Sequence, residues 1–366
     1  MSDPRCLDDL VTPAAVLDVD RVAKNLHTMA TYARDTGLRL RPHIKTHKTR
    51  ELASEQVRLG AIGVTCATLR EAEVMADVTS DILVAYPPVG RARLERLCAL
   101  PAHVSVTVGL DSREALSALA AAGAAAGRSF DVLVELDVGM RRVGLRSTSD
   151  VVALADQAAS HAATRFRGVM FYPGHIRQRV SEQHEAIARL AADLREHLDA
   201  LAAGGHATSV VSGGSTPAAL ASHRIDGLSE IRPGTYIFND RTTAEIDACA
   251  WEDCAYTVLA TVVSTAVNGQ AVVDAGSKAL NREELRAQGA RGYGALLDRP
   301  GIVVQSMSEE HGILDLSQSA WRPRIGDRVR IVPNHVCVSV NLHPVLWVVR
   351  GESVVDRYEV AARGWA

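Results

Sequence analysis

Short runs of β-branched and other apolar residues alternate with segments of helical periodicity from residue 14 to about residue 240. The runs predict eight strands, at residues 38–43, 63–66, 81–86, 103–108, 131–137, 166–172, 209–212 and 231–238. Helices are predicted between them, over residues 50–59, 69–76, 112–126, 150–163 and 181–203. This alternation indicates a (β/α)₈ barrel of the TIM type, closed by parallel pairing. An open doubly wound sheet is the alternative, but no Gly-x-Gly-x-x-Gly motif follows the first strand.

The pattern changes after residue 245, where helical segments become rare and strands dominate. Strand-like runs occupy residues 256–263, 270–274, 328–332 and 345–349, with glycines between them. We therefore expect an α/β chain of two domains, a barrel over residues 14–245 and a mostly β domain over 246–366 plus 1–13. An apolar run at residues 12–19 is a further strand that could complete the β domain.

Composition narrows the class of protein. With 366 residues, 47% of them hydrophobic and 23% charged, the chain is typical of a globular protein with a sizeable core. The net charge of -3, without a dense basic run, argues against a nucleic-acid partner. No apolar stretch reaches the roughly 20 residues of a membrane span, and the N-terminus lacks the apolar region of a signal peptide. Together with six scattered cysteines, this favours a cytoplasmic location.

A lysine lies at the end of the first predicted strand. The alternation Leu-Arg-Leu-Arg at 38–41 runs into Pro42, which cannot donate to a strand ladder, and Lys45 follows between His43 and His47. Barrels keep their chemistry at the carboxyl ends of their strands. A lysine among other cationic groups has a lowered pKa and becomes a usable nucleophile. Taken alone, however, such a segment is more often a solvated basic loop.

Glycine-containing turns follow the seventh and eighth predicted strands, Ser-Gly-Gly-Ser-Thr-Pro at 212–217 and Arg-Pro-Gly-Thr-Tyr at 232–236. Backbone amides and hydroxyls in such turns suit a phosphate, and barrels typically bind phosphate after strands seven and eight. Ring closure brings strand one beside strand eight. A lysine and a phosphate cradle together indicate pyridoxal 5'-phosphate, bound to Lys45 as a Schiff base. Arg141 and Arg142 after strand five, and Tyr172 and His175 after strand six, are further polar groups at the same mouth, although one of the two arginines is expected to be merely solvated.

The β domain contains a possible metal site, His335 and Cys337. If this segment is a strand, the two side chains point to the same face. Imidazole and thiolate favour Zn²⁺ over the harder Mn²⁺ or Mg²⁺. Such a pair is by itself more often simply packed in a core.

Taken together, the motifs resemble one known family. Its motifs are Pro-His-x-Lys-Thr-His-Lys (42–48), Asp-x-Gly-x-x-Arg-x-Gly (137–144), Tyr-x-Gly-His (172–175), Ser-Gly-Gly-Ser-Thr-Pro (212–217), Gly-x-Tyr (234–236), Asp-Ala-Gly-Ser-Lys (274–278), Glu-Glu-His-Gly (309–312) and Pro-Asn-His-x-Cys (333–337). In this order they are similar to the D-threonine aldolase / D-serine dehydratase family of fold-type III enzymes, related to alanine racemase. The resemblance implies a homodimer, a D-amino acid substrate, Lys45 as the cofactor lysine, and His335 and Cys337 as metal ligands. It also implies a set of cofactor contacts: Arg142, Tyr172, Ser212, Gly213, Gly214, Ser215, Thr216, Gly234 and Tyr236.

The resemblance leaves the reaction open. Aldolases of the family typically place an aspartate at the second metal position and D-serine dehydratases a cysteine, so Cys337 favours β-elimination to a 2-oxo acid and ammonia. Lys45 would take the α-proton and the metal would draw off the β-hydroxyl. Retro-aldol cleavage of D-threonine or 3-hydroxy-D-aspartate to glycine and an aldehyde is the alternative. Racemisation needs no metal, and a barrel-only protein that merely binds the cofactor would lack the β domain.

Overall fold

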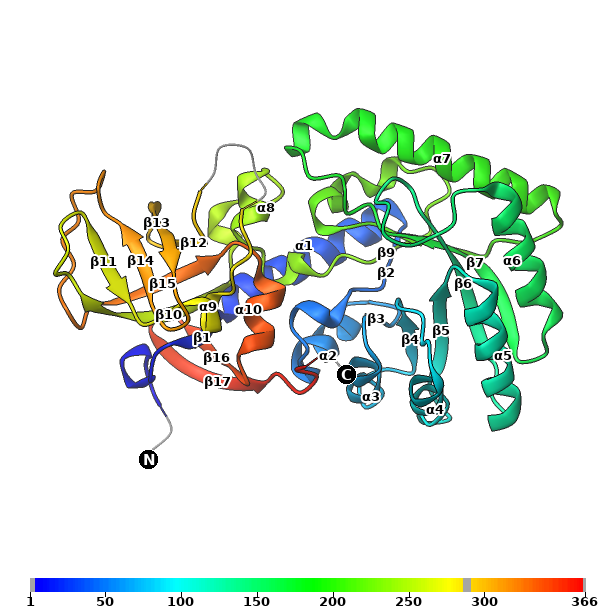
Figure 1. Ribbon diagram of the computed structural model, residues 1–366, viewed down its shortest axis with the longest axis horizontal. Helices are drawn as coiled ribbons and strands as arrows, with labels where there is room; N and C mark the ends of the chain where they lie inside the picture. Colours follow the sequence, from blue (N-terminus) through cyan, green and yellow to red (C-terminus); the bar gives the residue numbers. More distant parts are fainter. Residues whose placement is uncertain (1–3, 286–290, 365–366) are drawn as a thin grey trace. The chain divides into compact units, whose positions relative to one another are not determined.

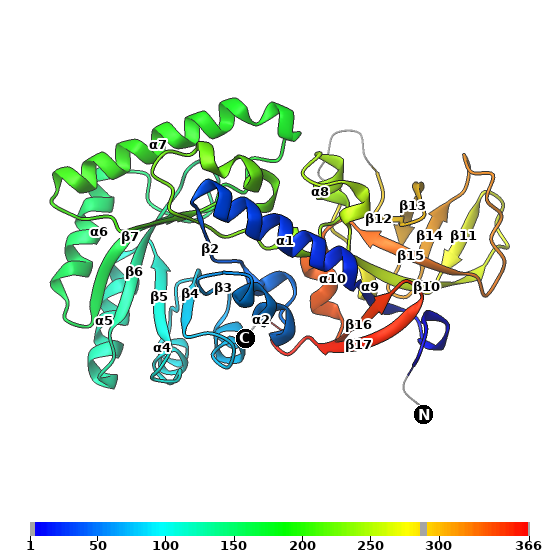
Figure 2. The same cartoon turned by 180° about the vertical axis from the view of Figure 1, so that it is seen from behind.

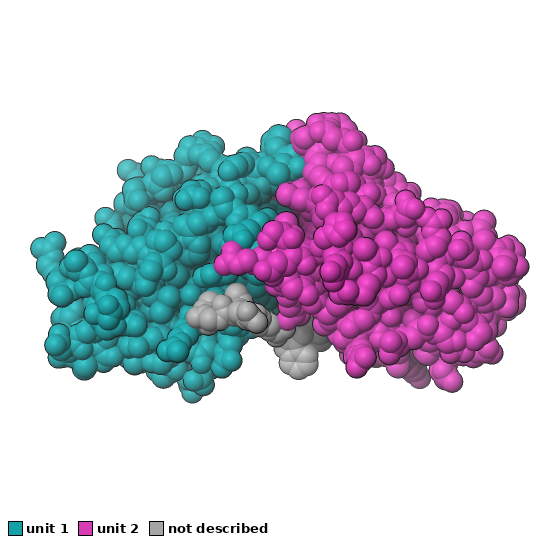
Figure 3. All heavy atoms as spheres, turned by 90° about the horizontal axis from the view of Figure 1, so that it is seen from above, with its two compact units in different colours: residues 1–28, 46–49, 235–363 teal, residues 29–45, 50–234, 364–366 magenta. Residues whose placement is uncertain are grey.

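The computed structural model describes residues 4–285 and 291–364, which form two compact units. Of the described residues, the barrel unit comprises 29–45, 50–234 and 364, and the β unit comprises 4–28, 46–49, 235–285 and 291–363 (Figure 3). Residues 14–28 fall in the β unit, where the strand at 14–18 pairs within the sheet, and residues 235–245 also belong to that unit. No helix in the described ranges is long and apolar enough to cross a membrane.

Eight parallel strands form the sheet of the barrel unit, in the order β2-β9-β8-β7-β6-β5-β4-β3 (Figure 1). They are β2 (Arg39–Leu40), β3 (Val64–Cys66), β4 (Asp81–Val84), β5 (Ser105–Leu110), β6 (Phe130–Leu136), β7 (Thr164–Phe171), β8 (Val210–Gly213) and β9 (Glu230–Ile231). Backbone hydrogen bonds also link the two ends of this order. Ile62 N donates to Leu40 O at 2.9 Å, and Thr65 N donates to Pro42 O at 2.8 Å. The sheet is therefore closed, and the predicted barrel class is confirmed.

Helices follow the strands of the barrel unit and bury their apolar faces. They are α2 (Arg50–Arg58), α3 (Leu69–Met75), α4 (Arg91–Cys98), α5 (Arg113–Ala126), α6 (Thr148–Ser160) and α7 (His184–Ala203), while α1 (Val19–Thr36) precedes β2. On α7 the buried Ile187, Leu190, Leu194 and Leu201 recur at helical spacing. Figures 1 and 2 show α5 and α6 along the outer side of β6 and β7. Helix α4 was not predicted from the sequence, because it buries only Leu94 and Leu97 and is otherwise strongly polar.

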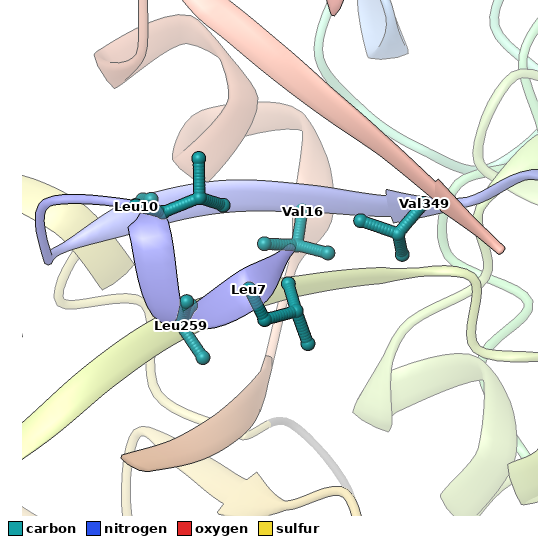
Figure 4. Packing of buried hydrophobic residues seen from close by; sticks show 6 residues of the cluster. Leu7, Leu10, Val16, Leu259 and Val349 are labelled. Atoms are coloured by element: carbon teal, nitrogen blue, oxygen red, sulfur yellow. The ribbon is translucent and has the colours of Figure 1, made fainter. Parts of the chain in front are cut away.

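In the described residues of the β unit, nine strands form the sheet, in the order β11-β14-β13-β12-β15-β10-β1-β16-β17, and β11 also pairs with β10. They are β1 (Ala14–Asp18), β10 (Tyr256–Ser264), β11 (Gln270–Val273), β12 (Gly294–Leu296), β13 (Arg299–Met307), β14 (Gly312–Asp315), β15 (Arg328–Pro333), β16 (Val345–Arg350) and β17 (Ser353–Glu359). The N-terminal strand completes this sheet, because β1 lies antiparallel to β10 and parallel to β16. A buried cluster fixes it there, formed by Leu7, Leu10, Val16, Leu259 and Val349 (Figure 4).

Two predicted strands are much shorter than expected. The first, predicted over 38–43, is only Arg39–Leu40. The eighth strand, predicted over 231–238, is only Glu230–Ile231, and a 3₁₀ turn at Thr235–Ile237 follows. Pro233 cannot donate a ladder hydrogen bond, so strand pairing ends before it. The segment after β9 thus turns at the carboxyl end of the strand, where a barrel places its site.

Candidate active site

Lys45 lies in a 3₁₀ turn, Ile44–Thr46, just beyond β2. Its Nζ is 5.6 Å from the centroid of the Tyr172 ring, which follows β7. The guanidinium carbon of Arg142 is 5.0 Å from the centroid of the same ring. A cation over a phenol ring is held by the quadrupole of the ring. The barrel therefore brings together three of the predicted site residues, with Lys45 and Arg142 both near the ring of Tyr172.

The end of β8, with Ser212 and Gly213, and the turn that follows it have the properties of an anion cradle. The hydroxyl oxygens of Ser212 and Ser215 are buried and have no hydrogen-bond partner in the described part of the chain. Such orphaned groups cost roughly 1–3 kcal/mol each unless a ligand satisfies them. Between them, Gly213 has no room for a side chain, because a Cβ there would lie 2.2 Å from Phe171 Cζ, and Gly214 has a positive φ of 96°. The hydroxyls and the closely approachable backbone fit a phosphate.

The structure places the remaining predicted cradle residues in different units. Thr216 opens the 3₁₀ helix Thr216–Arg224 directly after Ser215, and Gly234 follows β9, so both belong to the barrel unit. Tyr236 is buried in the β unit. The geometry thus groups Ser212, Gly213, Gly214, Ser215 and Thr216, and it does not by itself add Tyr236 to them.

Two buried charged residues of the barrel unit were missed by the sequence analysis. Arg232 follows β9 and donates from Nη2 to Phe171 O at 2.7 Å, while its Nε has no partner among the described residues. Burial lowers the pKa of Arg232, although the negative charges of Glu135 and Glu230 act to raise it. Burial also raises the pKa of Glu135, which Arg232 and Arg142 counteract. The signal in the sequence is the arginine at the start of the 232–236 turn, beside the glycine that identifies the turn.

Arg41, by contrast, is accounted for by structural contacts. Its guanidinium donates to both carboxylate oxygens of Asp81, at 2.6 and 3.1 Å, and to Glu230 Oε1 at 3.1 Å. Burial alone would lower the pKa of Arg41, but Asp81 and Glu230 outweigh it and the pKa is raised. These three residues form an ion-pair network that ties β2, β4 and β9 together.

The prediction that His335 and Cys337 lie on a strand is wrong. Strand β15 ends at Pro333, His335 is the N-cap of α10 (Val336–Leu342), and Cys337 lies in the first helical turn. The two side chains nevertheless interact. Burial alone would lower the pKa of His335, but Cys337 and a hydrogen bond to Asp240 outweigh it and raise the pKa well above its usual value. The conclusion that an imidazole and a thiol meet is retained, although by a different geometry.

The surroundings of this pair determine what it could bind. Cys337 Sγ is 3.1 Å from Thr46 Oγ1 and 3.8 Å from Thr235 Oγ1. Within the described residues, no group of three or more His, Cys, Asp or Glu side chains is arranged to hold a metal. A metal held by His335 and Cys337 alone would keep coordination positions for water or substrate. Nitrogen and sulfur donors fit Zn²⁺.

Comparison with known proteins agrees with this architecture. The family model for the N-terminal domain of alanine racemase matches residues 17–242, and that for a putative serine dehydratase domain matches residues 255–349. A D-threo-3-hydroxyaspartate dehydratase from Delftia sp. is 36% identical, with 97% of this chain and 98% of that protein covered. A D-threonine aldolase from Arthrobacter sp. is 33% identical (97% and 93% covered), and a D-serine dehydratase from Dictyostelium discoideum is 28% identical (95% and 96% covered).

Solved structures are similar to this chain over nearly its whole length. A D-threonine aldolase from Filomicrobium marinum superposes with a TM-score of 0.92 at 34% identity, with 99% of this chain and 98% of that chain covered. A cysteine-to-alanine variant of a D-threo-3-hydroxyaspartate dehydratase, in its metal-free form, superposes with a TM-score of 0.90 at 35% identity, with 98% and 100% covered. The ranges that the two family models match, residues 17–242 and 255–349, include parts of both the barrel unit and the β unit.

Proposed function

Because this chain belongs to the D-serine dehydratase / D-threonine aldolase family of pyridoxal-phosphate lyases, we propose that it eliminates water from a D-amino acid with a β-hydroxyl group, with D-serine as the first candidate substrate. The single observation that carries this proposal is the thiol of Cys337 beside the imidazole of His335. The products would be a 2-oxo acid and ammonia.

The barrel residues would hold the cofactor and move one proton. Bound pyridoxal phosphate supplies an electron sink for the charge that develops at the substrate Cα. The hydroxyls of Ser212 and Ser215 would donate hydrogen bonds to the phosphate of the cofactor. Arg232 would supply a buried positive charge beside the ring of the cofactor. Lys45 Nζ would hold the cofactor before substrate arrives and would then accept the α-proton. The Tyr172 ring positions that amine.

The β unit would supply the leaving-group chemistry. His335 and Cys337 would hold a zinc ion, whose Lewis acidity suits departure of a poor leaving group such as hydroxide. Thr46 follows Lys45 directly in the chain and contacts Cys337 Sγ at 3.1 Å, so one short backbone segment carries both the lysine and a neighbour of the thiol. The solved dehydratase variants give support of another kind. A histidine is replaced in one and a cysteine two positions later in the other, which is the spacing of His335 and Cys337.

Retro-aldol cleavage is the second candidate, and it is favoured by the similarity to D-threonine aldolases. The same lysine and metal pair could serve it, since the metal would then hold the β-oxygen while Cα–Cβ breaks. We further propose a homodimer, the assembly that the family resemblance implies.

Product analysis tests these proposals. The purified protein should be loaded with pyridoxal phosphate, treated with a chelator, and assayed with D-serine, D-threonine and D-3-hydroxyaspartate, with and without added zinc. We expect zinc-dependent pyruvate and ammonia from D-serine, and the fastest substrate to define the side-chain preference. Glycine and acetaldehyde from D-threonine without comparable pyruvate would establish the aldolase instead. Full activity after exhaustive chelation, with no metal found by elemental analysis, would refute the metal site.

A further inference from the structure

We infer that Asp240 is a positioning residue that orients the imidazole of His335 for metal binding. This inference rests on the proposed metal site, and Asp240 belongs to none of the motifs recognised in the sequence. Its carboxylate is 1% exposed and lies at the N-cap of the short helix α8 (Arg241–Glu245).

The two oxygens of Asp240 have different partners. Oδ1 accepts a hydrogen bond from Thr243 N at 2.9 Å, which caps α8. Oδ2 lies 3.0 Å from His335 Nδ1 and accepts a hydrogen bond from Val336 N at 3.2 Å. A carboxylate can only accept, so His335 must donate from Nδ1, and its Nε2 is then the nitrogen that can bind a metal. Carboxylates hold zinc-binding histidines in this way, fixing the tautomer and the ring orientation.

The backbone around His335 is held by the same region. The carbonyl of Asn334 accepts hydrogen bonds from Thr242 N at 3.2 Å and Thr242 Oγ1 at 2.6 Å. The carbonyl of His335 accepts one from Asn281 Nδ2 at 3.2 Å. The start of α8 is thus joined to the start of α10 by both backbone and side chain, so the ring has a defined position before any metal arrives.

Helix capping alone does not explain a carboxylate at this position. Serine, asparagine and threonine cap helices about as well as aspartate. A buried charge is costly unless it has a charged or strongly donating partner. Here Oδ2 accepts from the imidazole of His335 and from Val336 N, and a neutral cap with a single short side-chain oxygen would lose both of these bonds.

The test separates capping from positioning. In Asp240→Ser the helix keeps a good cap, but the acceptor that Oδ2 provides for His335 Nδ1 and Val336 N is lost, and we expect zinc affinity to fall about 10–100-fold. In the matched control Thr243→Val the cap loses a hydroxyl while Asp240 keeps its carboxylate, and we expect zinc affinity close to that of the wild type. Zinc affinity is measured by competition with a chromogenic chelator on the pyridoxal-phosphate-loaded protein. If D240S does not fold, Asp240→Thr takes its place, because threonine also caps a helix and likewise carries no second oxygen to accept from His335.

Cobalt(II) titration gives a second readout that does not depend on turnover. We expect D240S to keep a thiolate-to-cobalt absorption band, because Cys337 is intact, but to require a higher cobalt concentration to reach it. Equal zinc affinity of wild type and D240S would overturn the role of Asp240 while leaving the metal site standing. A wild-type protein that binds neither ion, or a His335→Ala variant that binds as tightly as wild type, would refute the metal site and this role with it.

Discussion

Replacing Gly213 by alanine should both destabilise the barrel unit and weaken cofactor binding. The added Cβ would lie 2.2, 2.5 and 2.6 Å from Cζ, Cε2 and Cε1 of Phe171. Non-bonded carbons prefer about 3.5–4.0 Å, so the nearest contact is more than 1 Å too short. Phe171 is fully buried and cannot swing into solvent. Overpacking a rigid core costs about 1–3 kcal/mol, and we expect the upper half of that range.

The magnitude can be checked by thermal unfolding and cofactor titration. The barrel unit has roughly 200 residues, and unfolding entropy is about 2.1 cal/mol/K per residue, so 2–3 kcal/mol corresponds to a loss of about 5–7 °C in Tm. Displacement of the adjacent Ser212 and Ser215 should weaken pyridoxal-phosphate affinity at least about tenfold, or about 1.4 kcal/mol. Gly301→Ala is the control, because a Cβ there meets nothing within 4 Å. A G213A protein with wild-type Tm and cofactor affinity would refute the reasoning.

Four further outcomes are expected. Borohydride reduction of the loaded protein should fix the cofactor on Lys45, and Lys45→Ala should abolish turnover; peptide mapping that finds the label on Lys48 or Lys278 would contradict the assignment. Ser212→Ala and Ser215→Ala should each weaken cofactor binding yet leave the stability of the cofactor-free protein nearly unchanged, because neither hydroxyl has a protein partner among the described residues. Cys337→Asp should shift metal preference from Zn²⁺ towards Mn²⁺ in metal-reconstituted assays and lower elimination, since oxygen is a harder ligand. Burial lowers the pKa of His343, so the contribution of this neutral side chain to the free energy of unfolding should be fully present above the unfolded-state pKa of about 6.5 and should be lost as pH falls below it. Denaturant unfolding at two pH values should therefore show a smaller loss of unfolding free energy for His343→Gln than for the wild type.

The barrel could be predicted from the sequence because its strands are locally encoded. Runs such as residues 131–137 combine β-branched residues with flanking turn signals, and their repetition with intervening helices leaves few possible topologies. The position of Lys45 followed from the same reasoning, since Pro42 marks where pairing ends. The structure places that lysine in the turn after β2. These features depend on residues close together in the chain.

The geometry of His335 and Cys337 could not be predicted in that way. The alternation Val-Cys-Val-Ser-Val over 336–340 indicates a strand, yet the segment is the helix α10. Helical spacing places Val336, Ser339 and Val340 on its buried face, and Asp240, 96 residues earlier in the chain, accepts the hydrogen bond from Val336 N. Tertiary contacts therefore override the local β preference. Arg232 and Glu135 were missed for a related reason, because only the folded barrel brings their charges near each other.

Hydrogen-bond partners set Arg41 apart from other buried polar residues at the carboxyl end of the barrel. Arg41 is buried, but its three hydrogen bonds to Asp81 and Glu230 account for the charge without a ligand. Ser212, Ser215 and Arg232 are equally buried and each has a polar atom without a partner in the described structure. Leaving such atoms unsatisfied costs stability unless a bound molecule completes them. Ser212 lies near the end of β8, Ser215 follows that strand, and Arg232 follows the adjacent strand β9, so one anionic ligand at the carboxyl end of the barrel could satisfy all three together.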